Sequence, residues 1–296
     1  MRTFDGHTLH VRTHGPDDAP LTVVLAHCWT ADTADWHYQV RDLLDRFGHG
    51  IRILTWDHRG HGRSDAAPMD ACTVENLARD MADVVDAHAP TGPLVLAGHS
   101  IGGMTMMALP EQRPDLVRRA VGAMFVATSA GGLRDVTLGL PEVGPLVKGQ
   151  IPRMLALRAR LVSRPHRRRT PTIERYVVQK LLFGHPLRPR DAGLVVDQLI
   201  NCCPATMRGF YESCLEHDRL DGLRAYDGIP VRVLVGDRDL LTPVEHARAI
   251  AHAIGSARLL IAPGAGHMLP LERDELVTRE LVGLVEHGLA RPGVAA

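Results

Sequence analysis

A serine between two glycines is the first feature of this sequence that could do chemistry. Ser100 lies in the segment 98–102, Gly-His-Ser-Ile-Gly, after the apolar run 94–97 and before a helical pattern at 103–109. Between a strand and a helix, Gly-x-Ser-x-Gly is the turn that presents a nucleophilic serine. Because this turn is strained, side chains at the two glycine positions would collide with neighbouring backbone. The following helix would point its first N–H groups at negative charge that develops beside the serine.

A serine hydroxyl is a weak nucleophile and needs a base, which in turn needs an acid to fix its tautomer. His267 lies in the glycine-rich loop 262–268, just after the last apolar run of the chain. Two acids, Asp237 and Asp239, directly follow the apolar run 231–235. Serine, aspartate and histidine in this chain order would support nucleophilic attack on a carbonyl carbon. The residues alone leave both aspartates open as the acid.

The elements that must position these residues follow an alternating pattern. Strands are predicted at 21–26, 51–56, 94–97, 120–127, 231–235 and 258–261, with an antiparallel edge strand at 8–13. Helices are predicted at 36–47, 74–89, 103–113, 244–254 and 276–288. This alternation indicates an α/β fold, a doubly wound and mostly parallel sheet covered on both faces. The polar turns follow the carboxyl ends of strands, where open α/β sheets place their sites.

The alternation stops between residues 130 and 218. No strand pattern occurs there, and eight prolines interrupt an irregular helical pattern. We interpret 130–218 as a helical cap inserted after the strand at 120–127. Residues 1–129 and 219–296 would then form the core domain.

The cap carries a local excess of positive charge. Between residues 148 and 190 twelve basic residues accompany one acid, Glu174. One interpretation is a lid helix at 151–162 with its apolar face over the pocket and its arginines in solvent. Another is a docking surface for an acyl carrier protein, a coenzyme A ester or anionic lipid headgroups. The basic residues are Lys148, Arg153, Arg158, Arg160, Arg164, Arg167, Arg168, Arg169, Arg175, Lys180, Arg188 and Arg190.

Several motifs together resemble the α/β-hydrolase superfamily. Besides 98–102, they are Asp-His-Arg-Gly-His-Gly-Arg-Ser at 57–64, Gly-Asp-Arg-Asp at 236–239 before Thr-Pro at 242–243, and Gly-His at 266–267. The nearest likeness is to small bacterial esterases, cofactor-free haloperoxidase-like enzymes and carbon–carbon bond hydrolases. The resemblance implies an α/β-hydrolase fold with no metal and no organic cofactor. It also implies that Ser100 is the nucleophile, His267 the base and Asp239 the acid.

The same resemblance implies where a developing oxyanion would be bound. In the family one donor is the backbone N–H after the nucleophile, here Ile101. The second comes from a His-Gly-aromatic turn after an early strand, which here reads His-Cys-Trp at 27–29, so Trp29 would supply that N–H. Cys28 replaces the usual glycine, and its side chain crowds this turn. Cys28, His99 and Met268 are predicted to contact the substrate, and the loop 57–64 is predicted to form a rigid support beneath the site.

The composition of the chain bears on its partners and on the compartment in which it would work. The sequence has 296 residues, 45% of them hydrophobic, and a formal net charge of zero, which does not favour nucleic acid as a partner. Five cysteines without metal-ligand spacing favour a reduced, cytoplasmic protein. No signal peptide and no apolar run long enough to span a bilayer is evident. The sequence leaves open whether copies associate into a homo-oligomer.

The sequence therefore predicts a serine hydrolase that cleaves a small-molecule carboxylic ester through an acyl-enzyme intermediate. Epoxide hydrolases and haloalkane dehalogenases of this superfamily place aspartate where Ser100 stands, so serine indicates acyl chemistry instead. One alternative is a thioesterase or acyltransferase of a biosynthetic pathway. The other is a ligand-binding protein that keeps the fold without turnover.

Overall fold

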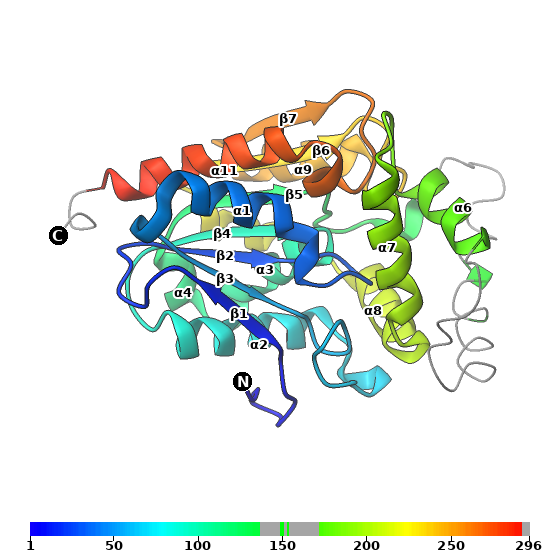
Figure 1. Cartoon of the computed structure of the whole chain (residues 1–296), viewed down its shortest axis with the longest axis horizontal. Helices are drawn as coiled ribbons and strands as arrows, with labels where there is room; N and C mark the ends of the chain where they lie inside the picture. The colour runs from blue at the N-terminus through cyan, green and yellow to red at the C-terminus, as the bar shows by residue number, and fades with distance from the viewer. Residues whose placement is uncertain (137–148, 151–152, 154–171, 292–296) are drawn as a thin grey trace.

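A seven-stranded sheet forms the centre of the computed structural model, which describes residues 1–136, 149–150, 153 and 172–291 (Figure 1). The strand order is β1-β3-β2-β4-β5-β6-β7, and every neighbouring pair is parallel except β1 and β3. The strands are β1 (Val11–His14), β2 (Thr22–Ala26), β3 (Arg52–Trp56), β4 (Leu94–His99), β5 (Ala120–Val126), β6 (Val231–Gly236) and β7 (Arg258–Ala262). The predicted α/β fold, with its antiparallel edge strand, is confirmed.

The edge strand is shorter than predicted. The backbone N–H of Thr8 donates to the carboxylate of Asp65 (2.8 Å), and that of His10 donates to the hydroxyl of Ser64 (2.9 Å). Side chains of the loop after β3 thus accept from the backbone N–H groups of Thr8 and His10, which are no longer available to pair with β3. The ladder with β3 therefore begins only at Val11.

The central strands bury both of their faces. Val24 and Leu96 pack into one hydrophobic cluster with side chains from α2, α3 and α9, whereas Val23 and Val95 pack into a second cluster with side chains from α1 and α11. Because successive residues of a strand point to opposite faces, near-continuous apolar runs are what a sheet covered on both sides requires. The carboxyl ends of these strands remain available for a site.

Each predicted core helix is present, but several ends differ by one or two residues, and two short helices were not predicted. A short helix α4 follows α3, because Pro114 restricts Arg113 to a non-helical conformation and then starts a new helix. The last helix, α11, begins two residues earlier than predicted, at Asp274. The core helices are α1 (His37–Phe47), α2 (Val74–His88), α3 (Ile101–Gln112), α4 (Pro114–Arg118), α9 (Val244–Ile254), α10 (Leu269–Glu272) and α11 (Asp274–Leu289). Short 3-10 helices are η1 (Thr33–Trp36), η2 (Gly48–Gly50), η3 (Met69–Ala71), η4 (Leu133–Asp135) and η5 (Asp221–Tyr226).

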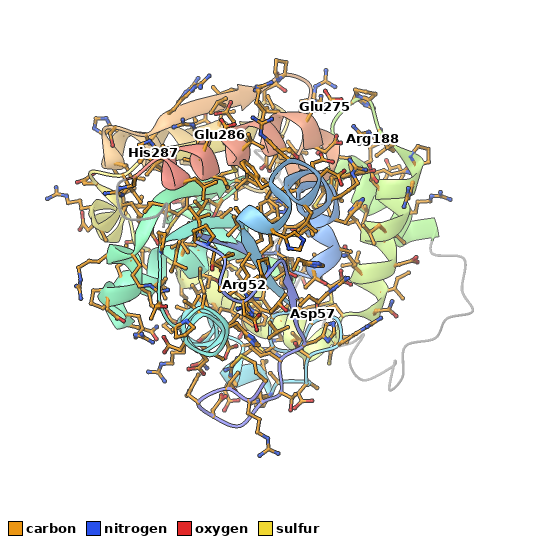
Figure 2. All side chains as sticks on the ribbon, turned by 60° about the vertical axis from the view of Figure 1, so that its left-hand side comes forward. Arg52, Asp57, Arg188, Glu275, Glu286 and His287 are labelled. Atoms are coloured by element: carbon orange, nitrogen blue, oxygen red, sulfur yellow. The ribbon has the colours of Figure 1, made fainter. Side chains whose placement is uncertain are left out.

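Three helices between β5 and β6 lie together at one side of the sheet in Figure 1: α6 (Thr172–Leu181), α7 (Pro189–Asn201) and α8 (Pro204–Glu216). Arg188, just before α7, pairs with Asp274 at the start of α11 (2.5 Å; Figure 2 labels Arg188). Tyr38 of α1 donates to Asp191 of α7 (3.0 Å). These polar contacts attach α7 to the core. Apart from Arg153, the predicted lid helix at 151–162 lies outside the described residues, as does most of the basic run.

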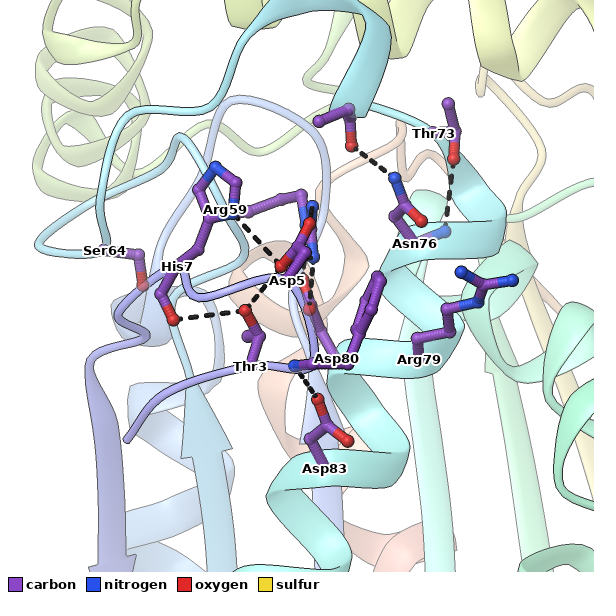
Figure 3. Close-up of polar contacts among 12 residues, drawn as sticks. Thr3, Asp5, His7, Arg59, Ser64, Thr73, Asn76, Arg79, Asp80 and Asp83 are labelled. Atoms are coloured by element: carbon purple, nitrogen blue, oxygen red, sulfur yellow. Dashed lines mark hydrogen bonds and ion pairs between the residues drawn. The ribbon is translucent and has the colours of Figure 1, made fainter.

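A buried arginine ties the loop after β3 to the N-terminal segment (Figure 3). The guanidinium of Arg59 donates to both carboxylate oxygens of Asp80 (2.7 and 2.6 Å) and of Asp5 (2.7 and 3.2 Å). Burial outweighs this pairing at Asp80 and raises its pKa to about 6. At Asp5 burial has the same direction, but the hydrogen bonds from Arg59 and Thr3 hold the pKa well below its usual range. This network anchors the loop 57–64 at Arg59; its role as a rigid support beneath the site stays a prediction.

All five cysteines are free thiols. Within the ranges that the structure describes, no helix is both long enough and apolar enough to cross a membrane.

Candidate active site

Ser100 occupies a strained turn between β4 and α3. Its backbone has φ 54° and ψ −116°, a left-handed region that serine rarely adopts. A side-chain carbon on Gly98 would lie 2.4 Å from the backbone of Gly102, and one on Gly102 would lie 2.3 Å from the carbonyl oxygen of Ala26. Both glycines are therefore required by the close packing, which agrees with the steric argument made from the sequence. The Ser100 N–H donates to the carbonyl of Val126 (2.9 Å), which holds the turn against β5.

The loops after β6 and β7 bring an aspartate and a histidine together. The N–H of Arg238 donates to the carbonyl of Ala265 (2.9 Å), so the two loops are hydrogen-bonded along their backbones. Across this junction Nδ1 of His267 lies 2.8 Å from Oδ2 of Asp239, and both side chains are buried. This contact fixes Nδ1–H as the donor to the carboxylate and leaves Nε2 as the basic nitrogen.

The carboxylate of Asp239 accepts from four donors. Besides His267, these are the backbone N–H groups of Leu241 and Thr242 (2.9 Å each) and the Thr242 hydroxyl (2.8 Å). Burial by itself would raise the pKa of Asp239, but the charge and hydrogen bond of His267, together with the Thr242 donors, lower it below its usual value. Thr242 thus orients the carboxylate. In the sequence Thr242 is recognisable only as part of the Thr-Pro motif at 242–243, which gives no sign of this role.

The rival acid, Asp237, has a different partner. Its Oδ1 accepts from the backbone N–H of Gly264 (2.7 Å), and this contact is exposed. Asp237 therefore holds the turn after β7. Of the two aspartates, only Asp239 contacts His267.

Ser100 and His267 line the same cavity, together with Cys28, Trp29 and Met268. The cavity measures about 310 Å³. Among the described residues, no hydrogen bond joins the Ser100 hydroxyl to His267; such contacts are often long in ligand-free sites and shorten when substrate binds. Six apolar side chains of the helices between β5 and β6 close the other side: Val178 and Leu181 of α6, Val195 and Leu199 of α7, and Met207 and Leu215 of α8.

Of the two predicted oxyanion donors, Trp29 lines this cavity, and Ile101 directly follows Ser100, which also lines it. Ile101 is the first residue of α3, and the turn 27–30 that carries Trp29 follows β2. Neither the Trp29 N–H nor the Ile101 N–H donates a hydrogen bond within the part of the chain that the structure describes. A helix leaves its first N–H groups without intrahelical partners, which makes them available to a ligand.

A cluster of buried histidines holds the turn 27–30. Nε2 of His27 accepts from the N–H of His58 (2.8 Å), and Nε2 of His61 accepts from the N–H of Thr30 (3.1 Å). Burial lowers the pKa of all three rings, that of His61 to about 4. The rings are therefore neutral at neutral pH, as the acceptor roles of His27 and His61 require.

His99 does not contact the substrate cavity, contrary to the prediction. Its Nδ1 lies 2.8 Å from Oδ2 of Asp35 and its Nε2 lies 2.9 Å from the carbonyl of His267. Burial alone would lower the pKa of His99, but the Asp35 carboxylate reverses the effect and raises it. Since a carboxylate and a carbonyl only accept, both ring nitrogens act as donors and the ring is an imidazolium. His99 therefore supports the backbone of His267.

Cys28 and Met268 line the cavity, and their contact with a substrate stays a prediction. Burial and then the charge of Asp35 raise the pKa of the Cys28 thiol well above its usual value, so it is a poor nucleophile.

Cys28, Asp35 and His99 also form the one group of potential metal ligands found among the described residues, with ligand atoms within 4.8 Å of one another. Tetrahedral zinc would hold nitrogen and oxygen ligands about 3.3 Å apart. Nδ1 of His99 lies only 2.8 Å from Oδ2 of Asp35. This distance fits an ion pair between the two side chains better than two ligands of one zinc ion.

The chain is similar to known proteins both in sequence and in structure. The model of the Alpha/beta hydrolase family matches residues 23–280. A Caulobacter sp. (strain K31) protein named as a candidate carbamate hydrolase, RutD, is 29% identical over 274 residues and covers 90% of each chain. The bifunctional esterase/perhydrolase DCH of Acinetobacter calcoaceticus is 25% identical over 290 residues, 96% of this chain and 98% of that one. The structure of a thermophilic esterase from Thermogutta terrifontis superposes with a TM-score of 0.75 at 25% identity, over 95% of this chain and 94% of the other.

The family match spans both halves of the sheet and includes Ser100, Asp239 and His267. The chain belongs to the alpha/beta hydrolase family of enzymes.

Proposed function

We propose that this enzyme is a serine hydrolase that cleaves a carboxylic ester through an acyl-enzyme intermediate. The observation that carries the proposal is the 2.8 Å contact between His267 and Asp239 on a cavity that Ser100 also lines. Esterase relatives that cover nearly the whole chain support the same chemistry.

In the proposed reaction the Ser100 oxygen attacks the ester carbonyl while Nε2 of His267 takes the hydroxyl proton. Asp239 stabilises the imidazolium that forms. The N–H groups of Ile101 and Trp29 bind the oxyanion of the tetrahedral intermediate. His267 then gives its proton to the leaving alcohol. In the second half, His267 takes a proton from water as the water oxygen attacks the acyl carbon; the bond to the Ser100 oxygen then breaks, His267 returns the proton to that oxygen, and the acid is released.

The proposed pocket lies between the core and the helices α6, α7 and α8, which we propose form the described part of a cap subdomain at 130–218. Apolar side chains from all three helices line the cavity. A cavity of this composition favours a substrate with an apolar acyl or alcohol group, because burial of such a group is favourable by about 25 cal/mol per Å². Small p-nitrophenyl esters of apolar acids are therefore suitable first substrates.

The direct test is labelling with a fluorophosphonate probe, which reacts with an activated serine, followed by mass spectrometry of the adduct. We expect a single adduct at Ser100 and none in Ser100→Ala. Ser100→Ala should also lose hydrolysis of p-nitrophenyl butyrate while its circular dichroism spectrum stays that of the unaltered protein. Turnover that survives in folded Ser100→Ala would refute the mechanism.

Labelling at Ser100 also separates the proposal from the alternatives. A ligand-binding protein without turnover would not react with the probe. A thioesterase or acyltransferase would react but would prefer thioesters to matched oxygen esters. The basic run that motivated a carrier-docking surface lies mostly outside the described residues, so the structure adds no support for that alternative.

A further inference from the structure

A second buried carboxylate lies next to the loop that carries His267. Glu272, the last residue of α10, is 6% exposed. Its oxygens accept from the backbone N–H of Gly266 (3.1 Å to each oxygen) and of Met268 (3.1 Å), the residues on either side of His267. Glu272 thus holds the peptide groups that flank the proposed base, without touching the cavity itself.

The third donor to Glu272 comes from a distant part of the chain. The N–H of Gly184, in the segment between α6 and α7, donates to Oε2 at 2.7 Å. In the same segment the carbonyl of Leu182 accepts from the N–H groups of His267 (2.8 Å) and Met268 (3.2 Å). The side chain of Leu182 lines the cavity. A residue against the substrate cavity is therefore hydrogen-bonded directly to the backbone of His267.

Two glycines make possible the close junction between the backbone segments 182–184 and 264–268. A side-chain carbon on Gly184 would lie 2.0 Å from the carbonyl oxygen of Gly264 and 2.7 Å from the nitrogen of Gly266. A side-chain carbon on Gly266 would in turn lie 2.7 Å from the nitrogen of Gly184 and from the oxygen of Leu182. The backbones of 182–184 and 264–268 therefore pack directly on each other, with no side chain between them to absorb a displacement.

We propose that Glu272 is a positioning residue that couples the seating of the segment 182–184 to the orientation of His267. The inference rests on the proposed function, since it takes His267 as the general base. The carboxylate provides acceptors for donors on both sides of the junction. When segment 182–184 is seated, Glu272 and Leu182 together fix the peptide groups at 266–268, and the imidazole is held against Asp239. When the junction loosens, His267 loses the orientation that its contact with Asp239 requires.

The test compares Glu272→Gln with the matched control Glu275→Gln. Glutamine keeps the shape of the side chain but replaces one acceptor oxygen by an NH₂ group that faces backbone donors. Glu275 lies three residues further on, at the exposed start of α11 (labelled in Figure 2). The readouts are kcat and KM with p-nitrophenyl butyrate, and the rate and final stoichiometry of fluorophosphonate labelling at Ser100.

For Glu272→Gln we expect kcat and the labelling rate to fall by about 10- to 100-fold, the usual cost of misplacing a catalytic group by about 1 Å. KM should change by less than about threefold, because no cavity side chain is altered, and labelling should still reach one probe per chain. Glu275→Gln should match the unaltered enzyme. If Glu272→Gln lowers the unfolding temperature but keeps its labelling rate within about twofold, the role of Glu272 is structural and the proposal is wrong.

Gly184→Ala perturbs the same junction from the other side. Because both changes act through one contact, the double variant with Glu272→Gln should be no more than about threefold slower than the slower single variant. If the losses of the two single variants multiply in the double variant, the two changes act independently and the proposed coupling is wrong. Should Glu272→Gln fail to fold, Glu272→Asp, which keeps the charge on a shorter side chain, replaces it in the same comparison. If the unaltered enzyme is not labelled at Ser100, the proposed function itself fails; if it is labelled and Glu272→Gln reacts equally fast, only the coupling fails.

Discussion

Replacing Asp239 by asparagine should disable the enzyme while leaving its fold in place. In the native site Oδ1 accepts from the backbone N–H groups of Leu241 and Thr242, and Oδ2 accepts from the Thr242 hydroxyl and from His267. The amide oxygen of asparagine can keep only one of these two positions. The two backbone donors place it at Oδ1, so the NH₂ group must face the hydroxyl and the imidazole.

An NH₂ group beside Nδ1 can only donate, so His267 must accept there and carry its proton on Nε2. In this tautomer the ring cannot take the proton of Ser100. The loss of the correct tautomer in a serine triad lowers kcat by about 10⁴-fold, which corresponds to about 5 kcal/mol of transition-state stabilisation. The fold should remain, because the hydroxyl of Thr242 can rotate to accept from the new NH₂ group and the two backbone donors keep their acceptor.

The assay is steady-state hydrolysis of p-nitrophenyl butyrate, with urea unfolding as the check on the fold. Asp237→Asn is the matched control, since its asparagine oxygen can still accept from Gly264; kcat should stay within about twofold of the unaltered enzyme. A loss below about tenfold in Asp239→Asn, with the control unchanged, would mean that the 2.8 Å contact does not set the tautomer of His267. A large loss in Asp237→Asn and none in Asp239→Asn would reverse the assignment of the acid.

Three further predictions concern the support of the site. Arg59→Met should lower the free energy of unfolding by about 3–5 kcal/mol in urea titrations, because it leaves the buried carboxylate of Asp80 without its partner; a change below about 1 kcal/mol would contradict this. The folded pKa of His61, about 4, lies below its unfolded value near 6.5, so its contribution to stability is fully present above pH 6.5 and is lost as the pH falls toward 4. His61→Gln should therefore reduce the slope of unfolding free energy against pH in this window by up to about 1.4 kcal/mol per pH unit, and an unchanged slope would refute the assignment. Iodoacetamide at pH 8 should alkylate exposed Cys203 but not Cys28, which is buried with a raised pKa; peptide mapping that finds Cys28 modified first would show that the turn 27–30 opens readily.

The strands and the nucleophile turn could be predicted from the sequence because their causes are local. Both faces of the central strands are buried, so each strand appears in the sequence as a continuous apolar run. The Ser100 turn needs glycine at 98 and 102, since a single added carbon at either position would overlap backbone. Strand boundaries were less predictable where distant groups intervene, as at Thr8 and His10, whose backbone N–H groups donate to Asp65 and Ser64.

The partners within the site depended on contacts between residues far apart in the chain. Asp237 and Asp239 are two residues apart and look alike in sequence; the backbone pairing of the loops after β6 and β7 determines which of them contacts His267. His99 was expected at the substrate, but Asp35, 64 residues away, takes its Nδ1. Glu272 and its partner Gly184 are 88 residues apart, and no local pattern connects them.

The sequence by itself therefore determined the residue types and turns that chemistry of this kind needs, since steric and periodic constraints act between near neighbours. Only the tertiary structure decided which acid orients the base, which histidine is a support, and which segment seats the His267 loop. Hydrogen bonds of about 3 Å between distant segments depend on how whole helices and strands pack, and that packing is a property of the complete fold.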